Sequence, residues 1–236
     1  MYDPAMNATD HRSAARDWRP QAFGGKRAAT IDDPIVEPLW TGLRVLAHVD
    51  GGLTTLRDLD GDAVEDFPEI NAALAGAIRA DRVVVDAHLT HQPVQAIAEV
   101  AARDTVETPK AAAAVGQMWF GLRRGGRTKA PQGPETVGRD PLPAGVDIAI
   151  VVVDLLWLDD QPLLDVPLLE RKRILEAVLD ESKLVRRGIY IRQPIDTWVG
   201  SWRTFGFNRM AFKAANSRYL PGQPNPDWAI ADLPTR

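Results

Sequence analysis

The sequence predicts an α+β protein whose antiparallel strands are flanked by helices. An alternating apolar run from Val45 to Val49 leads through Asp50-Gly51-Gly52 into a second alternating run that ends at Asp60-Gly61. Alternation on both sides of a glycine-containing turn is typical of a β-hairpin. The valine-rich stretch 82–89 predicts a central strand. Helices are indicated where apolar residues recur every three or four positions, in residues 68–78, 90–102 and 168–178.

The composition limits the number of domains and the kind of partner. With 236 residues, of which 45% are hydrophobic, the chain can bury one sizeable core. We expect an N-terminal arm in residues 1–30 and one domain in residues 31–236. The formal net charge of −4 argues against a surface that grips DNA phosphates along its whole length. Local basic patches remain open at residues 123–129 and 171–173, although a charged run on a helix is more often a solvated face.

Residue usage also excludes several kinds of site. The sequence contains no cysteine, which excludes disulfides, thiolate zinc sites and cysteine nucleophiles. Its longest apolar run, residues 148–158, is too short to span a bilayer. The first residues are mostly polar and show no apolar segment of the secretory type. We therefore expect a cytoplasmic protein that does not partner a membrane.

The loop before the first hairpin strand carries a distinctive pattern. Residues 37–44 are Glu-Pro-Leu-Trp-Thr-Gly-Leu-Arg. This pattern resembles the nucleotidyl-transfer motif of ATP-dependent DNA ligases, E-x-K-x-D-G-x-R, whose lysine attacks ATP and carries the AMP. Glu37 and Arg44 fit the motif, whereas Leu39 stands at the nucleophile position and Thr41 at the aspartate position. Leucine has no lone pair, so covalent AMP cannot form at this position.

Two further family motifs follow along the chain. Arg57 matches an arginine-bearing family strand, which comes before a Phe-Pro-Glu helix start at residues 67–69. Stretch 82–89 resembles the family strand ending in D-G-E, with Asp86 retained and His88 at the glutamate position. An imidazole does not replace a carboxylate beside magnesium. Asp86, His88 and His91 could instead form a transition-metal cluster, but incidental histidines are the commoner explanation, so we expect no metal site.

The longest continuous resemblance lies in residues 147–179. It is similar to the ligase segment F-D-L-L-Y-L-D-G followed by P-L-L-E-R-R, a buried strand that leads into a helix. Asp154 is retained, and we interpret it as a strand-end cap or a salt-bridge partner. Val153 stands where the family carries an aromatic side chain that stacks on adenine, so stacking on that face is lost.

The C-terminal part contains the last motifs. We expect a strand at residues 189–192 and a helix around 198–202. Stretch 207–213 aligns with E-G-V-V-A-K, which places Asn208 at the metal-binding glutamate and Lys213 at the retained lysine. In the final motif a family lysine position is Ile230. The resemblance therefore extends over residues 34–232, and we expect no OB domain after it, the domain that clamps DNA in active ligases.

The resemblance implies the ligase adenylation-domain fold, an ATP-grasp-like α+β arrangement with a nucleotide cleft between antiparallel sheets flanked by helices. Five positions that supply the nucleophile, the metal carboxylates and phosphate charge in the family are altered: Leu39, Thr41, His88, Asn208 and Ile230. The retained candidates for nucleotide binding are Glu37, Arg44, Arg57 and Lys213. Glu37 and Arg44 could equally be retained because they pair with other charges inside the sheet.

Two functions follow from these residues. The first is a catalytically inactive ligase homologue that acts as a binding or scaffolding protein in DNA repair, with weak binding of ATP and of DNA. The alternative is an active ATP-dependent DNA ligase or nucleotidyltransferase that uses another lysine, Lys26 or Lys213, together with ATP and magnesium. We favour the first because displacing a nucleophile by about 1 Å costs on the order of 10²-fold in rate.

Residues 103–145 read as a long loop or insertion rich in Ala, Gly, Pro, Thr and Arg. Within it, residues 115–129 combine Met118, Trp119 and Phe120 with three arginines. These side-chain types are enriched at interface hot spots. The segment therefore predicts contact with a protein partner or self-association, unless the aromatic pair covers this chain's own core.

Overall fold

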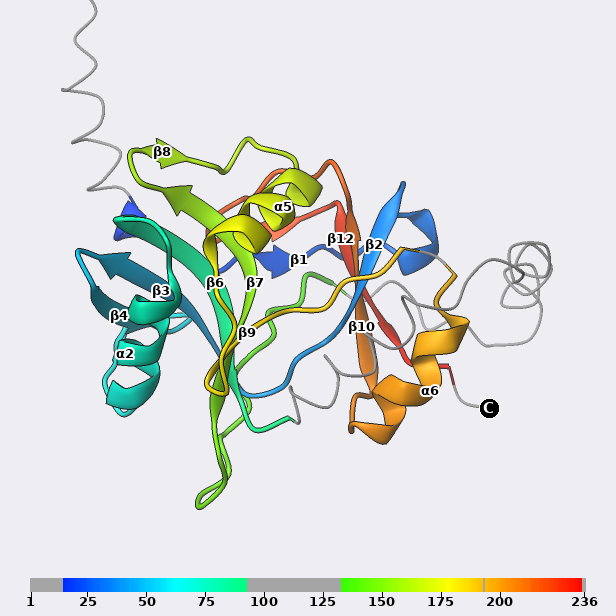
Figure 1. Cartoon of the computed structure of the whole chain (residues 1–236). Coiled ribbons are helices and arrows are strands. Elements are labelled where there is room, and N and C mark those ends of the chain that lie inside the picture. The colour runs from blue at the N-terminus through cyan, green and yellow to red at the C-terminus, as the bar shows by residue number, and fades with distance from the viewer. Residues whose placement is uncertain (1–14, 93–132, 193, 235–236) are drawn as a thin grey trace, which may run out of the picture.

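Two β-sheets that face each other form the centre of the molecule (Figure 1). The computed structural model describes residues 15–92, 133–192 and 194–234. The larger sheet has the strand order β5 (Ala63–Val64), β4 (Leu53–Arg57), β3 (Leu43–Asp50), β6 (Arg82–Thr90), β7 (Ala149–Leu158) and β8 (Gln161–Pro162), with β9 (Val185–Arg187) parallel to β7. The smaller sheet has the order β12 (Trp228–Asp232), β10 (Arg209–Ala214) and β2 (Pro34–Pro38). A short parallel pair joins β1 (Ala22–Phe23) to β11 (Pro224–Asn225), and a 3₁₀ turn covers Ala28–Thr30.

The helices cover the sheets. Helix α2 (Pro68–Ala77) lies against β4 and the large sheet, and α6 (Asp196–Thr204) lies near the small sheet (Figure 1). Pro68 suits the first turn of α2, where its missing N–H would have no intrahelical partner. Helix α5 (Leu168–Val178) packs on β7 and also reaches the inner space between the sheets. This helix is therefore placed to contribute side chains to both the core and the inter-sheet region.

Strand alternation separates three apolar cores. On β3, Val45, Ala47 and Val49 face a core shared with α2 and α5. Leu46 points to the opposite face, into the core between the two sheets. A third core lies between the small sheet and α6, around Trp202 and Phe207. Every residue of β6 after Arg82 is buried, as the run of valines predicts for a central strand.

Most of the expected elements are present. The hairpin is confirmed by the antiparallel pairing of β3 with β4, and the strand over 82–89 is confirmed by β6. Helices α2 and α5 confirm the apolar spacing at 68–78 and 168–178. The expected helix over 90–102 does not begin at Thr90, which ends β6, and residues 93–102 lie outside the described part.

The strand expected over 189–192 is wrong. The chain instead forms β9 at Val185–Arg187, beside residues 150–152 of β7. After Gly188 donates to the Val152 carbonyl, the chain leaves the large sheet and crosses to β2. There Ile191 makes a single bridge with Val36. The apolar residues at 189–191 reflect burial during this crossing between sheets, not membership of one strand.

The described part of the N-terminal arm is packed into the fold. Gln21 and Phe23 are buried, and β1 pairs with β11 near the other end of the chain. The described end of the expected 103–145 insertion also pairs with the rest of the fold. Glu135 forms an isolated antiparallel β-bridge with Phe23, and Arg139 forms one with Leu43. Among the described helices, each is too short or too polar to cross a membrane.

Candidate functional site

Glu37 lies at the centre of a buried charge cluster at the motif positions. Its carboxylate accepts from Lys213 Nζ at 2.7 Å and lies 2.5 Å from Lys172 Nζ. Strand β2 supplies Glu37, β10 supplies Lys213 and α5 supplies Lys172. Burial opposes the charged carboxylate, but the two ammonium groups outweigh it and hold the pKa of Glu37 below its ordinary value. The carboxylate is therefore committed to an internal ion triplet.

Lys213 is held on both sides. Besides the bond to Glu37, its ammonium lies 4.1 Å from the centroid of the Trp228 ring, a cation–π contact. Burial lowers the pKa of Lys213, and nearby Lys172 adds to this effect against the opposing attraction of Glu37. A deprotonated amine is the nucleophilic form of lysine, so accessibility decides whether this side chain can react. Only 3% of Lys213 is exposed.

The basic run 171–173 is not a solvated patch. Arg171 and Lys172 are buried, and only Arg173 of the three is exposed. Arg171 forms two hydrogen bonds with the Asp154 carboxylate, at 2.8 and 2.7 Å, and Lys172 also donates to the Val153 carbonyl at 2.6 Å. Residues 168, 171, 172 and 175 share one helix face, so the apolar stripe carries both cations inward. Asp154 is accordingly a salt-bridge partner.

Arg44 forms a second buried pair across the large sheet. Its guanidinium donates to both oxygens of Asp86, at 2.9 and 2.5 Å, and to the Gln21 carbonyl at 2.8 Å. Tyr219 Oη also donates to Asp86, at 2.7 Å. Burial acts against charge on Asp86, but Arg44 prevails and lowers the pKa of that carboxyl. Bidentate pairing of this kind leaves Arg44 little capacity for a nucleotide phosphate.

His88 is a neutral side chain in this region. It lies opposite Arg44 in the β3–β6 register. Burial, followed by the positive charge of Arg44, lowers the pKa of His88 to about 3. Among residues 15–92, 133–192 and 194–234, no group of three His, Asp or Glu side chains is arranged to hold a metal. His91, the third member of the hypothetical cluster, is exposed while Asp86 and His88 are buried.

Space at the motif positions is almost absent. Glu37, Leu39, Arg44, His88, Val153 and Lys213 line a common cavity of about 10 Å³. That volume suits at most about one water molecule, whereas small-molecule sites usually measure about 300–1,000 Å³. Leu39 and Val153, both apolar at positions where the family motif is polar or aromatic, are part of the wall.

The remaining motif positions do not line this cavity. The backbone N–H of Thr41 donates to Gln92 Oε1 at 2.9 Å. Asn208 is exposed just before β10, and its carbonyl accepts from Leu233. Ile230 is half-buried on β12, opposite Ala211. Arg57 lies on β4 and lines a different pocket, while its guanidinium donates to the Gly61 carbonyl at 2.8 Å.

The sequence alone missed Lys172 and Gln21 as members of the site. Lys172 is part of a basic run, which favours a solvated helix face. Its position one helical turn after Leu168, on the apolar face of α5, indicates burial instead. Gln21 gave no local signal. It reaches the site through long-range contacts, with its carbonyl bound to Arg44 and its side-chain oxygen bound to Leu220 N–H and Asn225.

Comparison with known proteins places this arrangement in a structural context. No protein-family model and no curated protein matches the chain. Among solved structures, the ligase domain of LigD from M. tuberculosis matches 92% of the chain with 20% identity and a TM-score of 0.59. Mycobacterial DNA ligase D complexed with ATP and MES matches 90% with 21% identity and a TM-score of 0.57. The chain has the fold of a DNA ligase domain.

The ligase fold accounts for the order of the motif-bearing elements. The match covers 60% of the M. tuberculosis domain and 59% of the ATP complex, so this chain spans less than two thirds of each structure. At this level of identity the likeness shows the fold, and the chemistry must be argued from side chains. In the described residues those side chains form a filled and charge-paired region where the family resemblance implies a nucleotide cleft.

Proposed function

We propose that this chain is a catalytically inactive relative of ATP-dependent DNA ligases that acts as a binding or scaffolding protein in DNA repair. The cavity of about 10 Å³ at the motif positions carries the proposal, because ATP cannot enter such a space without rearrangement of the core. A similar solved structure is a DNA ligase D complexed with ATP. In this chain the corresponding function is opposed by Leu39 at the nucleophile position and by the internal pairing of Glu37.

The alternative is a nucleotidyltransferase with a different lysine. The lowered pKa of Lys213 favours it, because a neutral amine is more readily available for attack. Its burial between Glu37 and Trp228 opposes it. Lys26 is about half-exposed and lies 3.7 Å from Asp227, but it does not line the motif cavity. ATP and magnesium are cofactors only under this alternative.

Incubation with α-labelled ATP and magnesium, followed by denaturing electrophoresis, tests the proposal. We expect no labelled band from the natural chain. The Leu39→Lys variant should also stay unlabelled, because the cavity remains too small and His88 and Asn208 supply no metal carboxylate. An active ligase domain serves as the positive control. A stable label that maps to Lys213 or Lys26, and disappears on replacement of that lysine, would establish the alternative.

The scaffolding role is tested through residues 115–129, which lie outside the described residues. Under the proposal, deletion of this segment abolishes assembly in light scattering or pull-down while the melting temperature stays unchanged. If the aromatic pair covers the chain's own core, the deletion instead lowers the melting temperature and assembly persists in the folded fraction. Weak binding of nicked DNA at physiological salt is expected in both cases, given the net charge of −4.

A further inference from the structure

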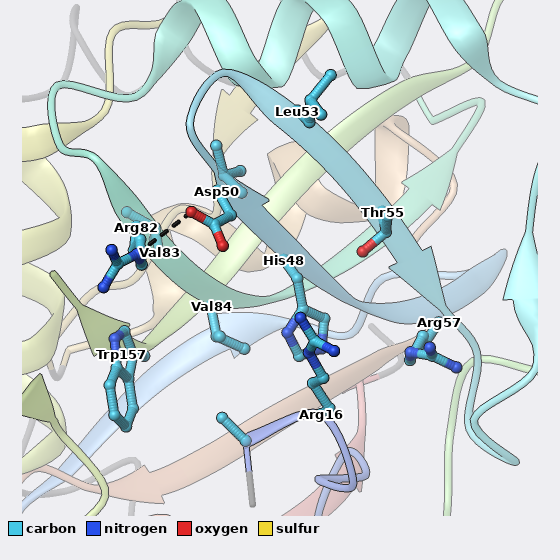
Figure 2. Close-up of a pocket in the computed structure, with 12 residues that line it drawn as sticks. Arg16, His48, Asp50, Leu53, Thr55, Arg57, Arg82, Val83, Val84 and Trp157 are labelled. Carbon is cyan, nitrogen blue, oxygen red and sulfur yellow. Dashed lines mark hydrogen bonds and ion pairs between the residues drawn. The ribbon is translucent and has the colours of Figure 1, made fainter. Parts of the chain in front are cut away.

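A second pocket lies further along the same face of the large sheet and has the opposite character. It measures about 590 Å³, within the usual range of about 300–1,000 Å³ for small-molecule sites. Strands β3 and β4 supply its floor, and Arg16 approaches from the N-terminal segment (Figure 2). On β3, Leu46 is buried between Arg44 of the motif cavity and His48 of this pocket. The two sites are therefore neighbours that a packed apolar layer separates.

Strand register explains why polar groups gather here. In the β3–β4 pairing, His48 lies opposite Thr55, Asp50 opposite Leu53, and Leu46 opposite Arg57. Alternate residues of each strand point to one face, so Thr55 and Arg57 project to the same side as His48. Figure 2 shows these side chains along the two strands, with Val84 and Trp157 as apolar walls. The pocket thus combines guanidinium and hydroxyl groups with apolar side chains.

Positive charge in this pocket exceeds the negative charge that is paired with it. Asp50 and Asp160 both pair with Arg82. Arg57 donates to the Gly61 carbonyl, which orients its guanidinium without neutralising it. The adjacent Arg19 donates to the carbonyls of residues 17, 18 and 60 and is also attracted by the Asp60 carboxylate, which pairs with Arg139. Arg16 lines the pocket, is exposed and has no ion pair among the described residues. This arrangement favours an anion.

The pKa of His48 responds to the positive charges around the pocket. Burial, followed by the positive charges of Arg57, Arg16 and Arg19, lowers its pKa to about 4. The imidazole is consequently neutral at pH 7 and adds no charge to the pocket. Guanidinium groups suit phosphate oxygens because they offer paired N–H donors in a planar fork.

We propose that this pocket binds a phosphate-bearing small molecule of about mononucleotide size, with Arg16 and Arg57 as the phosphate-contacting residues. The phosphate lies between these guanidinium groups, and the Thr55 hydroxyl is placed to donate to it or to a neighbouring oxygen. The organic part lies along Val84 toward the Arg82–Asp50 pair. This site goes beyond the proposed scaffolding function and does not depend on whether the motif cavity is inactive.

Calorimetric titration of the full chain with AMP, inorganic phosphate and adenosine tests the proposal. We expect saturable AMP binding, competition by inorganic phosphate and no binding of adenosine. The double variant Arg16→Gln/Arg57→Gln should bind AMP at least about tenfold more weakly, because two charge-assisted contacts are lost. The control is Arg173→Gln, which alters an exposed arginine on α5 that pairs with Glu170. Its affinity should equal that of the natural chain, and the melting temperatures of all variants should show that they are folded.

A titration of the His48 imidazole by NMR gives an independent readout. A bound phosphate offsets the field of the arginines, so AMP should raise the pKa of His48 from about 4 by about one unit or more, while the His88 signal stays unchanged. A His48→Gln variant assigns the resonance.

Four outcomes would overturn the proposal that this pocket binds a phosphate-bearing molecule. The first is that neither AMP nor phosphate binds saturably, and the second is that the double variant binds AMP as tightly as the natural chain. The third is that Lys213→Met abolishes AMP binding while the double variant retains it. The fourth is that a 5′-phosphorylated oligonucleotide binds much more tightly than AMP. The third would move the ligand to the motif cavity, and the fourth would indicate a nucleic-acid surface. None of them is an adenylylation assay, so failure of this site is distinguishable from failure of the proposed function.

Discussion

The same two central strands line the motif cavity around Glu37 and the larger pocket around Arg16, His48 and Arg57, which we call the basic pocket. The two sites differ in how their charged side chains are paired. Strand β3 gives Arg44 to the first and His48 to the second, and β6 gives His88 to the first and Val84 to the second. In the motif cavity each carboxylate lies against a cation and side chains fill the space. In the basic pocket cations outnumber their carboxylate partners and the space stays open. Breaking a buried charge pair destabilises a fold, whereas unpaired charge beside open space is available to a ligand.

The largest expected loss of stability comes from breaking the buried ion triplet of Glu37, Lys172 and Lys213, compared with breaking a surface pair. Glu37→Gln leaves Lys172 and Lys213 buried side by side, and breaking such a buried pair typically costs about 3–5 kcal/mol in the free energy of unfolding. The matched control is Asp180→Asn, whose pair with Arg79 is more than half exposed, so its loss should be far smaller than that of Glu37→Gln. Chemical denaturation measures both. Equal losses would mean that the triplet contributes no more than a surface pair.

Adding Lys213→Met to Glu37→Gln sharpens this test. The double variant removes one of the two unpaired cations, so it should recover part of the lost stability. Simple additivity of the two losses would contradict direct coupling between the side chains.

The next largest loss of stability is expected from adding a methyl group at a glycine packed beside the motif cavity, compared with a glycine at the open end of the β3–β4 hairpin. Gly138 has φ +96° and lies against Arg44, so a Cβ added there would overlap with Arg44 Cβ. We expect Gly138→Ala to cost about 2–4 kcal/mol, from the left-handed backbone and from the clash. Gly51 also has a positive φ, +56°, but open space surrounds it, so Gly51→Ala should cost only about 1–2 kcal/mol. Thermal unfolding of the two variants separates packing from backbone strain.

A pH dependence of stability should come from both regions. His48 and His88 have folded-state pKa values of about 4 and about 3, below the ordinary value of 6.5. The unfolded chain therefore takes up protons first, so stability is complete above about pH 6.5 and falls as the pH drops below it. Each histidine should contribute on the order of 1–2 kcal/mol of loss between pH 7 and 5.

Denaturation of His48→Gln and His88→Gln at several pH values checks these contributions, because each variant should flatten the profile. This window lies above the ordinary pKa of 4.5 for Glu37, whose depressed pKa adds a loss only at lower pH. If the natural chain is equally stable at pH 7 and 5, the histidines are not held neutral.

The smallest effect is expected in the basic pocket. Arg16→Gln removes one of several like charges from an exposed position, so the free energy of unfolding should change by no more than about 0.5 kcal/mol. A slight gain is consistent with relief of repulsion between arginines. A loss comparable to that of Glu37→Gln would show that Arg16 is a structural residue, and the contrast between the two regions would fail.

Local patterns were sufficient for much of the fold. Alternation around Asp50-Gly51-Gly52 predicted the β3–β4 hairpin, and continuous valine predicted the buried β6. Apolar spacing predicted α2 and α5. The order of the motifs indicated a ligase fold before any comparison of structures, in agreement with the likeness to the M. tuberculosis ligase domain. Such features depend on neighbours in the sequence, which is why they can be read from it.

The sequence by itself determined which side chains are available: leucine in place of the nucleophile, and histidine and asparagine in place of carboxylates. Only the tertiary structure decided what the retained charges do. Glu37 meets Lys172 and Lys213 from α5 and β10, and Arg16 approaches His48 from the N-terminal segment, across long separations in the chain. Burial, pairing and open volume are properties of such long-range contacts. No local pattern could therefore distinguish the filled cavity from the open pocket.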